Sequence, residues 1–115
     1  MHPFAIRKIT TSDGKILYDR KPSDPIKLLK DETVSQMKEL LYDVVRNGTG
    51  RRAFVSGKTI GGKTGTSANY RDAWFVGATS DLTIGIWVGN DDYSPMDDIT
   101  GGSLPAEIFK NIIAN

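Results

Sequence analysis

The sequence contains no cysteine and only one histidine, His2, among its 115 residues. Without cysteine there can be no disulfide, no thiolate metal site and no cysteine nucleophile. A histidine-based triad or metal site would have to use His2, which lies beside the start of the chain, where chains fray. We therefore predict no metal site and no cofactor.

Long apolar segments are also absent. The longest uncharged apolar stretches, residues 73–80 and 82–90, are far shorter than the roughly 20 residues that a membrane helix needs. No basic-then-apolar leader is visible at the N-terminus. We expect no membrane contact by this segment. The protein is then either cytosolic or an internal piece whose targeting segment lies elsewhere.

Basic residues are scarce in the second half of the chain. Residues 1–63 hold 13 Lys or Arg against 7 Asp or Glu, whereas residues 64–115 hold 2 against 7. Such asymmetry can mark a nucleic-acid surface. Apart from Arg51 and Arg52, however, the basic residues are scattered, which is typical of a solvated face. We therefore predict no nucleic-acid partner.

The first third of the chain predicts a hairpin followed by a linker. Residues 4–9 and 16–18 have the apolar and β-branched composition of strands, and the Asp-Gly pair at positions 13–14 favours a turn between them. Residues 21–27 contain two prolines, which are incompatible with a helix or a sheet interior.

A helical pattern begins at residue 31 and ends at residue 47. We expect Asn47 and Gly48 to end this helix in the left-handed conformation that both residues tolerate. A second, shorter helix is predicted over residues 104–113, with Leu104, Ile108 and Ile112 on one side. The apolar stripe of the first helix comprises Val34, Met37, Leu41 and Val44, joined by Leu40 and Val45.

Three strands are predicted between these helices, over residues 59–67, 73–80 and 82–90. The connection at residues 80–81 is short, as an antiparallel meander requires. A polar loop over residues 91–102 leads to the second helix. The fold class is therefore α+β: an antiparallel sheet with helices packed on it. We treat residues 1–115 as a single segment of one domain.

The glycine-rich segment at residues 57–66 permits two interpretations. Residues 57–64, GKTIGGKT, match the phosphate-loop pattern of nucleotide-binding domains. That motif needs a helix directly after it, whose amides face the phosphates. Here Gly65, Thr66 and Ser67 follow, and the next strands are linked too tightly for the helical crossovers of a parallel sheet. The phosphate loop is therefore the alternative interpretation.

The second interpretation takes Lys63, Thr64, Gly65 and Thr66 as the K-T-G motif of serine acyltransferases that recognise β-lactams. The segment is predicted to lie on an edge strand. A lysine ammonium can hold an anionic substrate tail and make nearby hydroxyls more acidic. The threonines offer hydroxyls, and Gly65 leaves space for a peptide to lie along the edge.

The resemblance extends over nearly the whole chain. The sequence is similar to the C-terminal part of the transpeptidase domain of class A penicillin-binding proteins, with the serine β-lactamase/transpeptidase-like fold. The segments that carry this resemblance are residues 61–67, 70–77, 86–92 and 101–106, together with residues 5–9 and 48–53.

Two elements of that family are missing. Its S-x-x-K element supplies the acylated serine, and an S-x-N element completes the site. Residues 12–15, SDGK, match the first only as a string and fall in a predicted hairpin turn. Residues 67–69, SAN, match the second only as a string and follow the K-T-G strand instead of preceding it. The chain therefore holds no activated nucleophile, and we expect the isolated fragment to be inactive.

For the parent protein the resemblance implies a serine D,D-transpeptidase that cross-links peptidoglycan stem peptides and binds β-lactams. It implies that the Thr66 N–H donates to an oxyanion, and that Lys63, Thr64 and Thr66 bind the terminal carboxylate. It also implies a parent anchored in the bacterial inner membrane, with this domain on the extracytoplasmic side. A non-catalytic binding module remains a further alternative.

Other residues have more ordinary interpretations. Trp74 and Trp87 are predicted to be core or interface aromatics. Asp72 fits either a brace for the site or a turn residue. We interpret the acidic cluster as a solvated loop, because its spacing matches no EF-hand; it comprises Asp91, Asp92, Asp97 and Asp98. The strongly apolar strands with few charges predict self-association of the fragment through a sheet edge or an exchanged hairpin.

Overall fold

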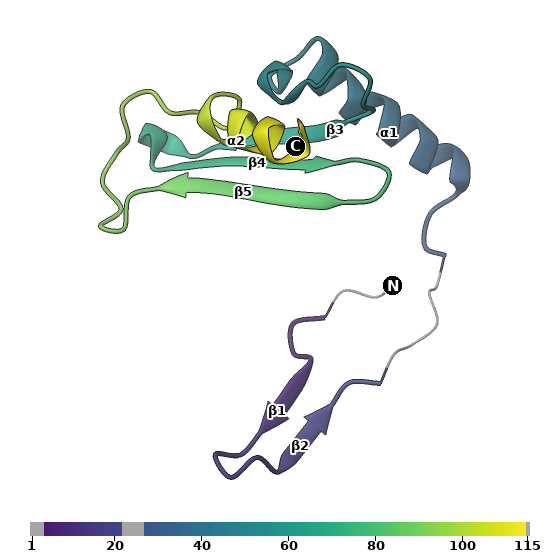
Figure 1. Cartoon of the computed structure of the whole chain (residues 1–115), viewed down its shortest axis with the longest axis vertical. Coiled ribbons are helices and arrows are strands. Elements are labelled where there is room, and N and C mark those ends of the chain that lie inside the picture. Colours follow the sequence, from purple (N-terminus) through teal and green to yellow (C-terminus); the bar gives the residue numbers. More distant parts are fainter. Residues whose placement is uncertain (1–3, 22–26, 115) are drawn as a thin grey trace. The chain divides into compact units, whose positions relative to one another are not determined.

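The computed structural model describes residues 4–21 and 27–114, which form two units, Met1–Lys30 and Asp31–Asn115 (Figure 1). The first unit contains an antiparallel hairpin of β1 (Lys8–Thr10) and β2 (Ile16–Asp19). Gly14 adopts a φ of 87° at the turn, which explains the glycine there. The hairpin prediction is confirmed, although residues 4–7 lie outside the strand.

The hairpin unit has no buried apolar side chain among its described residues. An isolated two-stranded hairpin is only marginally stable in water. Most of the predicted linker lies outside the described residues. The exposed large apolar side chains of this unit are Phe4, Ile6, Ile9, Ile16, Leu17, Tyr18, Leu28 and Leu29.

The second unit contains one sheet and its helices. Its α-helices are α1 (Asp31–Arg46) and α2 (Leu104–Ala114), and two short 3₁₀ helices are η1 (Arg51–Ala53) and η2 (Ala68–Tyr70). The strands β3 (Gly61–Thr66), β4 (Asp72–Ala78) and β5 (Thr83–Gly89) form an antiparallel meander in the order β3-β4-β5. The predicted α+β architecture is confirmed.

Helix α2 covers one face of this sheet (Figure 1). Phe75 of β4 and Phe109 of α2 are both fully buried, and their rings meet edge to face with centroids 5.1 Å apart. Burying two such rings is a main source of stability in a small domain. The remaining members of the buried core are Val45, Ala53, Ile60, Ala106 and Ile113.

The other sheet face is open within the described residues. Trp74, Val76 and Trp87 point to this face, because strand residues alternate between faces, and each keeps close to half of its surface exposed. We name these three residues the open face. Large exposed apolar clusters of this kind mark contact surfaces.

The structure corrects the predicted helix faces. On α1, Met37 and Leu40 of the predicted stripe are 54% and 64% exposed, whereas Val45 of the same stripe is buried as expected, because the contacts of α1 with the sheet are concentrated on β3. On α2, Leu104 and Ile112 are exposed, and the buried side instead comprises Pro105, Ala106, Phe109 and Ile113. In each case the packing partner, and not the apolar periodicity alone, selects the face.

Helix α1 ends at the predicted position but by a different device. Neither Asn47 nor Gly48 has a positive φ. Instead the Asn47 side-chain amide donates to the Asp43 carboxylate over 2.7 Å, and the backbone N–H of Gly48 donates to the Asp43 carbonyl over 3.1 Å. The Gly50 N–H in turn donates to the Val44 carbonyl over 2.9 Å, which satisfies one of the carbonyl groups that the end of a helix leaves unpaired.

Candidate active site

The K-T-G segment lies on β3, which pairs only with β4 among the described strands. Two glycines allow β3 to fit into its place. A Cβ atom at Gly62 would lie 2.5 Å from the Phe75 ring, and one at Gly61 would lie 3.1 Å from the Tyr42 ring. The absence of side chains at these positions therefore lets β3 pack closely between α1 and the core.

One long edge of β3 carries backbone groups that are not paired with any described strand. The Lys63 ammonium donates to the Thr64 carbonyl over 2.8 Å, so this carbonyl points away from β4. Beyond the end of β3, the Ser67 N–H donates to the Asp72 carbonyl over 2.9 Å, so the backbone groups of Ser67 face β4. Because backbone groups alternate in direction along an antiparallel strand, the N–H of Thr66 also points to the free edge.

The side chains of β3 leave the strand on two faces. Lys63 pairs with Val76 and faces the open side of the sheet, where its side chain is exposed. Thr64 and Thr66, in register with Phe75 and Ala73, belong to the opposite face. The lysine and the threonine hydroxyls of the motif are thus separated by the strand itself.

Both threonines line a polar cavity of about 400 Å³. The Thr64 hydroxyl shares a hydrogen bond of 2.8 Å with the Thr49 hydroxyl. The Thr66 hydroxyl oxygen accepts a bond of 3.1 Å from the Gly101 N–H. We name this cavity the hydroxyl pocket; its lining residues are Thr49, Arg52, Thr64, Thr66, Thr100, Gly102 and Ser103.

Two adjacent glycines, Gly101 and Gly102, hold the following loop against the strands, and Gly102 also lines this pocket. A Cβ atom at Gly101 would lie 2.1 Å from the Trp74 carbonyl oxygen, and one at Gly102 would lie 2.2 Å from the Thr49 carbonyl oxygen. These distances are far shorter than any real contact, so only glycine allows the loop to press against the strands. This close approach brings Thr100 and Ser103 to the pocket.

Four residues of this pocket are not indicated by any sequence pattern: Thr49, Arg52, Thr100 and Ser103. Thr49 and Arg52 precede Thr64 by more than ten residues, and the other two follow Thr66 by more than thirty, so spacing could not join them. A signal was present nevertheless, because three of the four lie in the segments 48–53 and 101–106 that carry the family resemblance.

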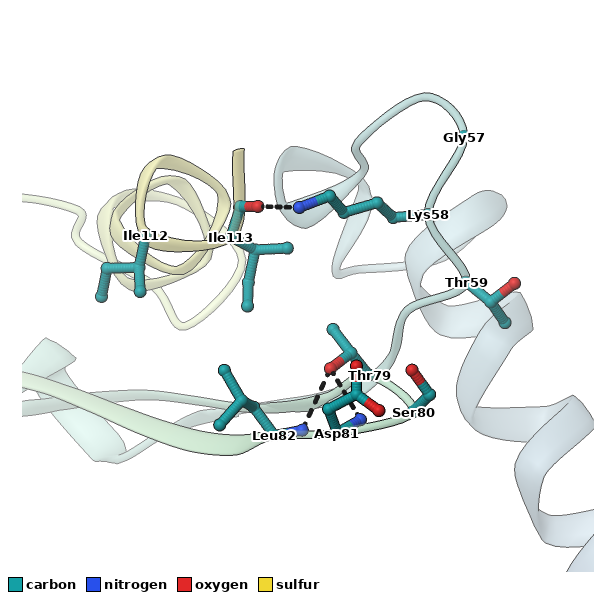
Figure 2. A pocket seen from close by; sticks show the side chains of 9 residues that line it. All are labelled: Gly57, Lys58, Thr59, Thr79, Ser80, Asp81, Leu82, Ile112 and Ile113. Atoms are coloured by element: carbon teal, nitrogen blue, oxygen red, sulfur yellow. Dashed lines mark hydrogen bonds between the residues drawn. The ribbon is translucent and has the colours of Figure 1, made fainter. Parts of the chain in front are cut away.

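The structure does not support a phosphate loop at residues 57–64. Gly61–Thr66 is a strand and not a loop, and the residues after it form the short η2 instead of an α-helix. Figure 2 shows the start of the segment beside a separate cavity of about 570 Å³. There the Lys58 ammonium donates to the Ile113 carbonyl at the C-terminal end of α2.

The two serine strings have structural roles, in agreement with the sequence analysis. Ser12 lies in the exposed turn of the hairpin. The Ser67 hydroxyl accepts a hydrogen bond of 2.8 Å from the Asp72 N–H and so fixes the β3–β4 connection. Neither serine begins an α-helix with a lysine one turn later, as an S-x-x-K element requires.

Asp72 braces a tryptophan of the open face. Its carboxylate accepts a hydrogen bond of 3.1 Å from the Trp87 indole N–H, and the Trp87 and Trp74 rings lie 6.4 Å apart. In the acidic loop, hydrogen bonds from Ser94 hold the pKa of Asp92 below its usual value. No group of three or more potential metal ligands comes together in the described part of the chain.

No helix within residues 4–21 and 27–114 is long and apolar enough to span a membrane.

Comparisons with known proteins show the family of the chain. The family described as "Penicillin binding protein transpeptidase domain" matches residues 1–114. The chain is 38% identical over 109 residues to penicillin-binding protein 4 of Bacillus subtilis, covering 95% of the chain and 17% of that protein. It is 42% identical over 104 residues to penicillin-binding protein 1A of Aquifex aeolicus, covering 90% and 14%. The chain therefore spans about one sixth of the length of these relatives.

Solved structures show the same fold. The D,D-transpeptidase domain of a peptidoglycan glycosyltransferase from Eggerthella lenta superposes with a TM-score of 0.61 at 23% identity, covering 94% of this chain and 25% of that one. The transpeptidase domain of the FtsI4 D,D-transpeptidase from Legionella pneumophila gives a TM-score of 0.56 at 25% identity, covering 75% and 35%.

Proposed function

Because the chain belongs to the family of penicillin-binding protein transpeptidase domains, we propose that it forms part of the acyl-transfer site of a D,D-transpeptidase. In this proposal a serine outside the chain attacks the penultimate D-Ala carbonyl of a peptidoglycan stem peptide and displaces the last D-Ala. The acyl group then passes to an amine of a neighbouring stem. The whole protein would also bind β-lactams and would be anchored in the inner membrane, with this domain outside.

The observation that carries the proposal is the free edge of β3 beside the hydroxyl pocket. A substrate peptide would lie along this edge as an added strand, held by outward backbone groups. The Thr66 N–H would donate to the oxyanion, and Gly65 would leave room for the peptide backbone. The hydroxyls of Thr64 and Thr66 would bind the substrate's terminal carboxylate.

Lys63 has a different part in this arrangement. Its ammonium lies at the edge of β3, bonded to the Thr64 carbonyl, and its side chain leaves the strand on the face opposite the hydroxyl pocket. From this position its positive field would make a neighbouring serine hydroxyl more acidic. We therefore assign Lys63 to the nucleophile side of the site.

A penicillin-labelling experiment tests the proposal. The longer protein that joins this chain to a serine-bearing region should form a stoichiometric adduct with a fluorescent penicillin, detected by mass spectrometry. The isolated 115-residue chain should form none. An adduct on the isolated chain, or no adduct on the longer protein, would contradict the proposal.

A pair of variants at one position tests the oxyanion role. Thr66→Pro deletes the outward N–H, and an edge strand tolerates proline at such a position. We expect acylation of the longer protein to fall about 100–1,000-fold, the usual cost of losing one oxyanion donor. Thr66→Val keeps the N–H and loses only the hydroxyl, so a smaller loss is expected. Equal losses of acylation rate in the two variants would show that the Thr66 N–H does not stabilise the oxyanion.

A further inference from the structure

The hydroxyl pocket has the composition of an anion site. Five of its lining residues carry a hydroxyl, the sixth is Arg52, and Gly102 completes the wall. No carboxylate of the described residues lines it. A pocket with donors and a fixed positive charge, and without a negative one, favours an oxyanion over a neutral or cationic ligand.

The hydroxyl protons can be accounted for. The Thr66 oxygen accepts from the Gly101 N–H, so its own proton remains available to a ligand. Thr49 and Thr64 share one hydrogen bond, in which one of them donates. The other hydroxyl of the pair therefore keeps a free proton. Two hydroxyl donors thus point to one pocket, which matches the two oxygens of a carboxylate.

The Ser103 hydroxyl is already used within the pocket wall. It donates to the Thr100 carbonyl over 2.8 Å and accepts from the Thr100 N–H over 2.9 Å. These two bonds hold the loop that follows the acidic segment in a fixed shape. Ser103 is therefore a positioning residue of the wall, and the ligand donors are the threonines and Arg52.

The motif lysine does not supply the charge in this pocket. Lys63 is absent from the lining, since it alternates with Thr64 and Thr66 along β3 and faces the other side. Arg52 reaches the pocket from η1, whereas its neighbour Arg51 lines a different cavity beside Val45 and Phe54. The adjacent arginines therefore have separate surroundings.

We propose that Arg52 is the positively charged partner of the substrate carboxylate, bound together with the hydroxyls of Thr49, Thr64 and Thr66. This inference rests on the proposed function for the identity of the ligand. A planar guanidinium can donate two parallel bonds to a carboxylate, so it fixes both the charge and the orientation of the substrate's end. Arg52 then makes the site selective for a free acid over its uncharged amide.

The kinetic test uses the longer protein and two matched substrates, a peptide ending in a free D-Ala carboxylate and the same peptide ending in a primary amide. Arg52→Gln should lower kcat/KM for the acid about tenfold to a hundredfold and leave the amide nearly unchanged. Arg52→Lys should recover part of the selectivity. Arg51→Gln, the matched control, should resemble the unmodified protein. Unchanged acid selectivity in Arg52→Gln would overturn the inference.

A binding test separates this inference from the proposed function. The 115-residue chain is labelled with ¹⁵N and titrated with acetate, with acetamide as the uncharged control. We expect saturable shifts of the Thr49, Thr66 and Gly101 amides with acetate alone, and their loss in Arg52→Gln. If acetate shifts these amides but the longer protein does not react with penicillin, the anion site stands and the proposed transpeptidase function is wrong. No acetate-specific shift would reject the site, whatever the longer protein does.

Discussion

Phe75 and Trp74 are neighbours on β4, yet Phe75 is fully buried beneath α2 whereas Trp74 is 46% exposed on the open face. The backbone of the sheet is the same for both. What differs is the covering element: α2 supplies Phe109 on one side, and no described residue has an equivalent part on the other. The stability of this unit is therefore concentrated on the α2 face, and the open face is a surface for contact.

Removing the Phe109 ring, which covers Phe75, should have the largest effect on the stability of the α2 face. We predict that Phe109→Ala destabilises the chain by about 3–5 kcal/mol, because it deletes a fully buried ring and leaves a cavity against Phe75. Urea denaturation followed by circular dichroism measures the change. Ile112→Ala on the same helix is the control, since Ile112 is half exposed and should lose under about 1 kcal/mol. Similar losses in the two variants would contradict the contrast.

Glycine-to-alanine substitutions on the two faces of the sheet should show the same contrast between the α2 face and the open face. A Cβ atom at Gly77 would lie 2.5 Å from the Phe109 ring, so we expect Gly77→Ala to cost about 1–3 kcal/mol by overpacking. Gly85 is the matched control on β5, because its nearest neighbour would be the Val76 side chain at 3.9 Å. Gly85→Ala should be neutral or slightly stabilising. Thermal denaturation distinguishes the two, and a harmless Gly77→Ala would show that α2 can move away.

The open face should matter least for folding and most for association. We predict that the isolated chain forms a dimer or larger assembly, since its sheet has uncovered apolar surface and unpaired edges. Trp74→Lys combined with Val76→Lys should change the stability of the folded chain by less than about 1 kcal/mol. The same pair should shift the light-scattering mass towards the monomer. An unmodified chain that is monomeric at all concentrations would exclude this self-association.

The secondary structure could be predicted from the sequence more reliably than the packing. The three strands and two helices were found because alternation and helical periodicity are local patterns. Which side of a helix is buried depends on distant residues, so Met37 and Ile112 were assigned to the wrong environment. The end of α1 was located correctly, while its capping contact with Asp43 could not be read from Asn47 and Gly48 alone.

The candidate site was predictable only in part for the same reason. The K-T-G string marks β3, and its motif residues lie on an edge strand as expected. The hydroxyl pocket depends on contacts that join residues 49 and 64, and residues 66 and 101. No periodicity connects such positions. The reason for glycine at positions 101 and 102 is their close approach to two backbone carbonyls, and this too is visible only in the three-dimensional structure.

Under the proposed function, the outward N–H of Thr66 would have a consequence for inherited resistance to inhibitors. A main-chain amide belongs to every residue except proline, so nearly every codon change at this position preserves it. The charged and hydroxyl side chains of the pocket have no such protection, since a single nucleotide change can replace Arg52 or Thr49. Few single substitutions would therefore weaken an inhibitor that binds mainly to the backbone of the β3 edge. Several would weaken one that binds to the side chains of the hydroxyl pocket.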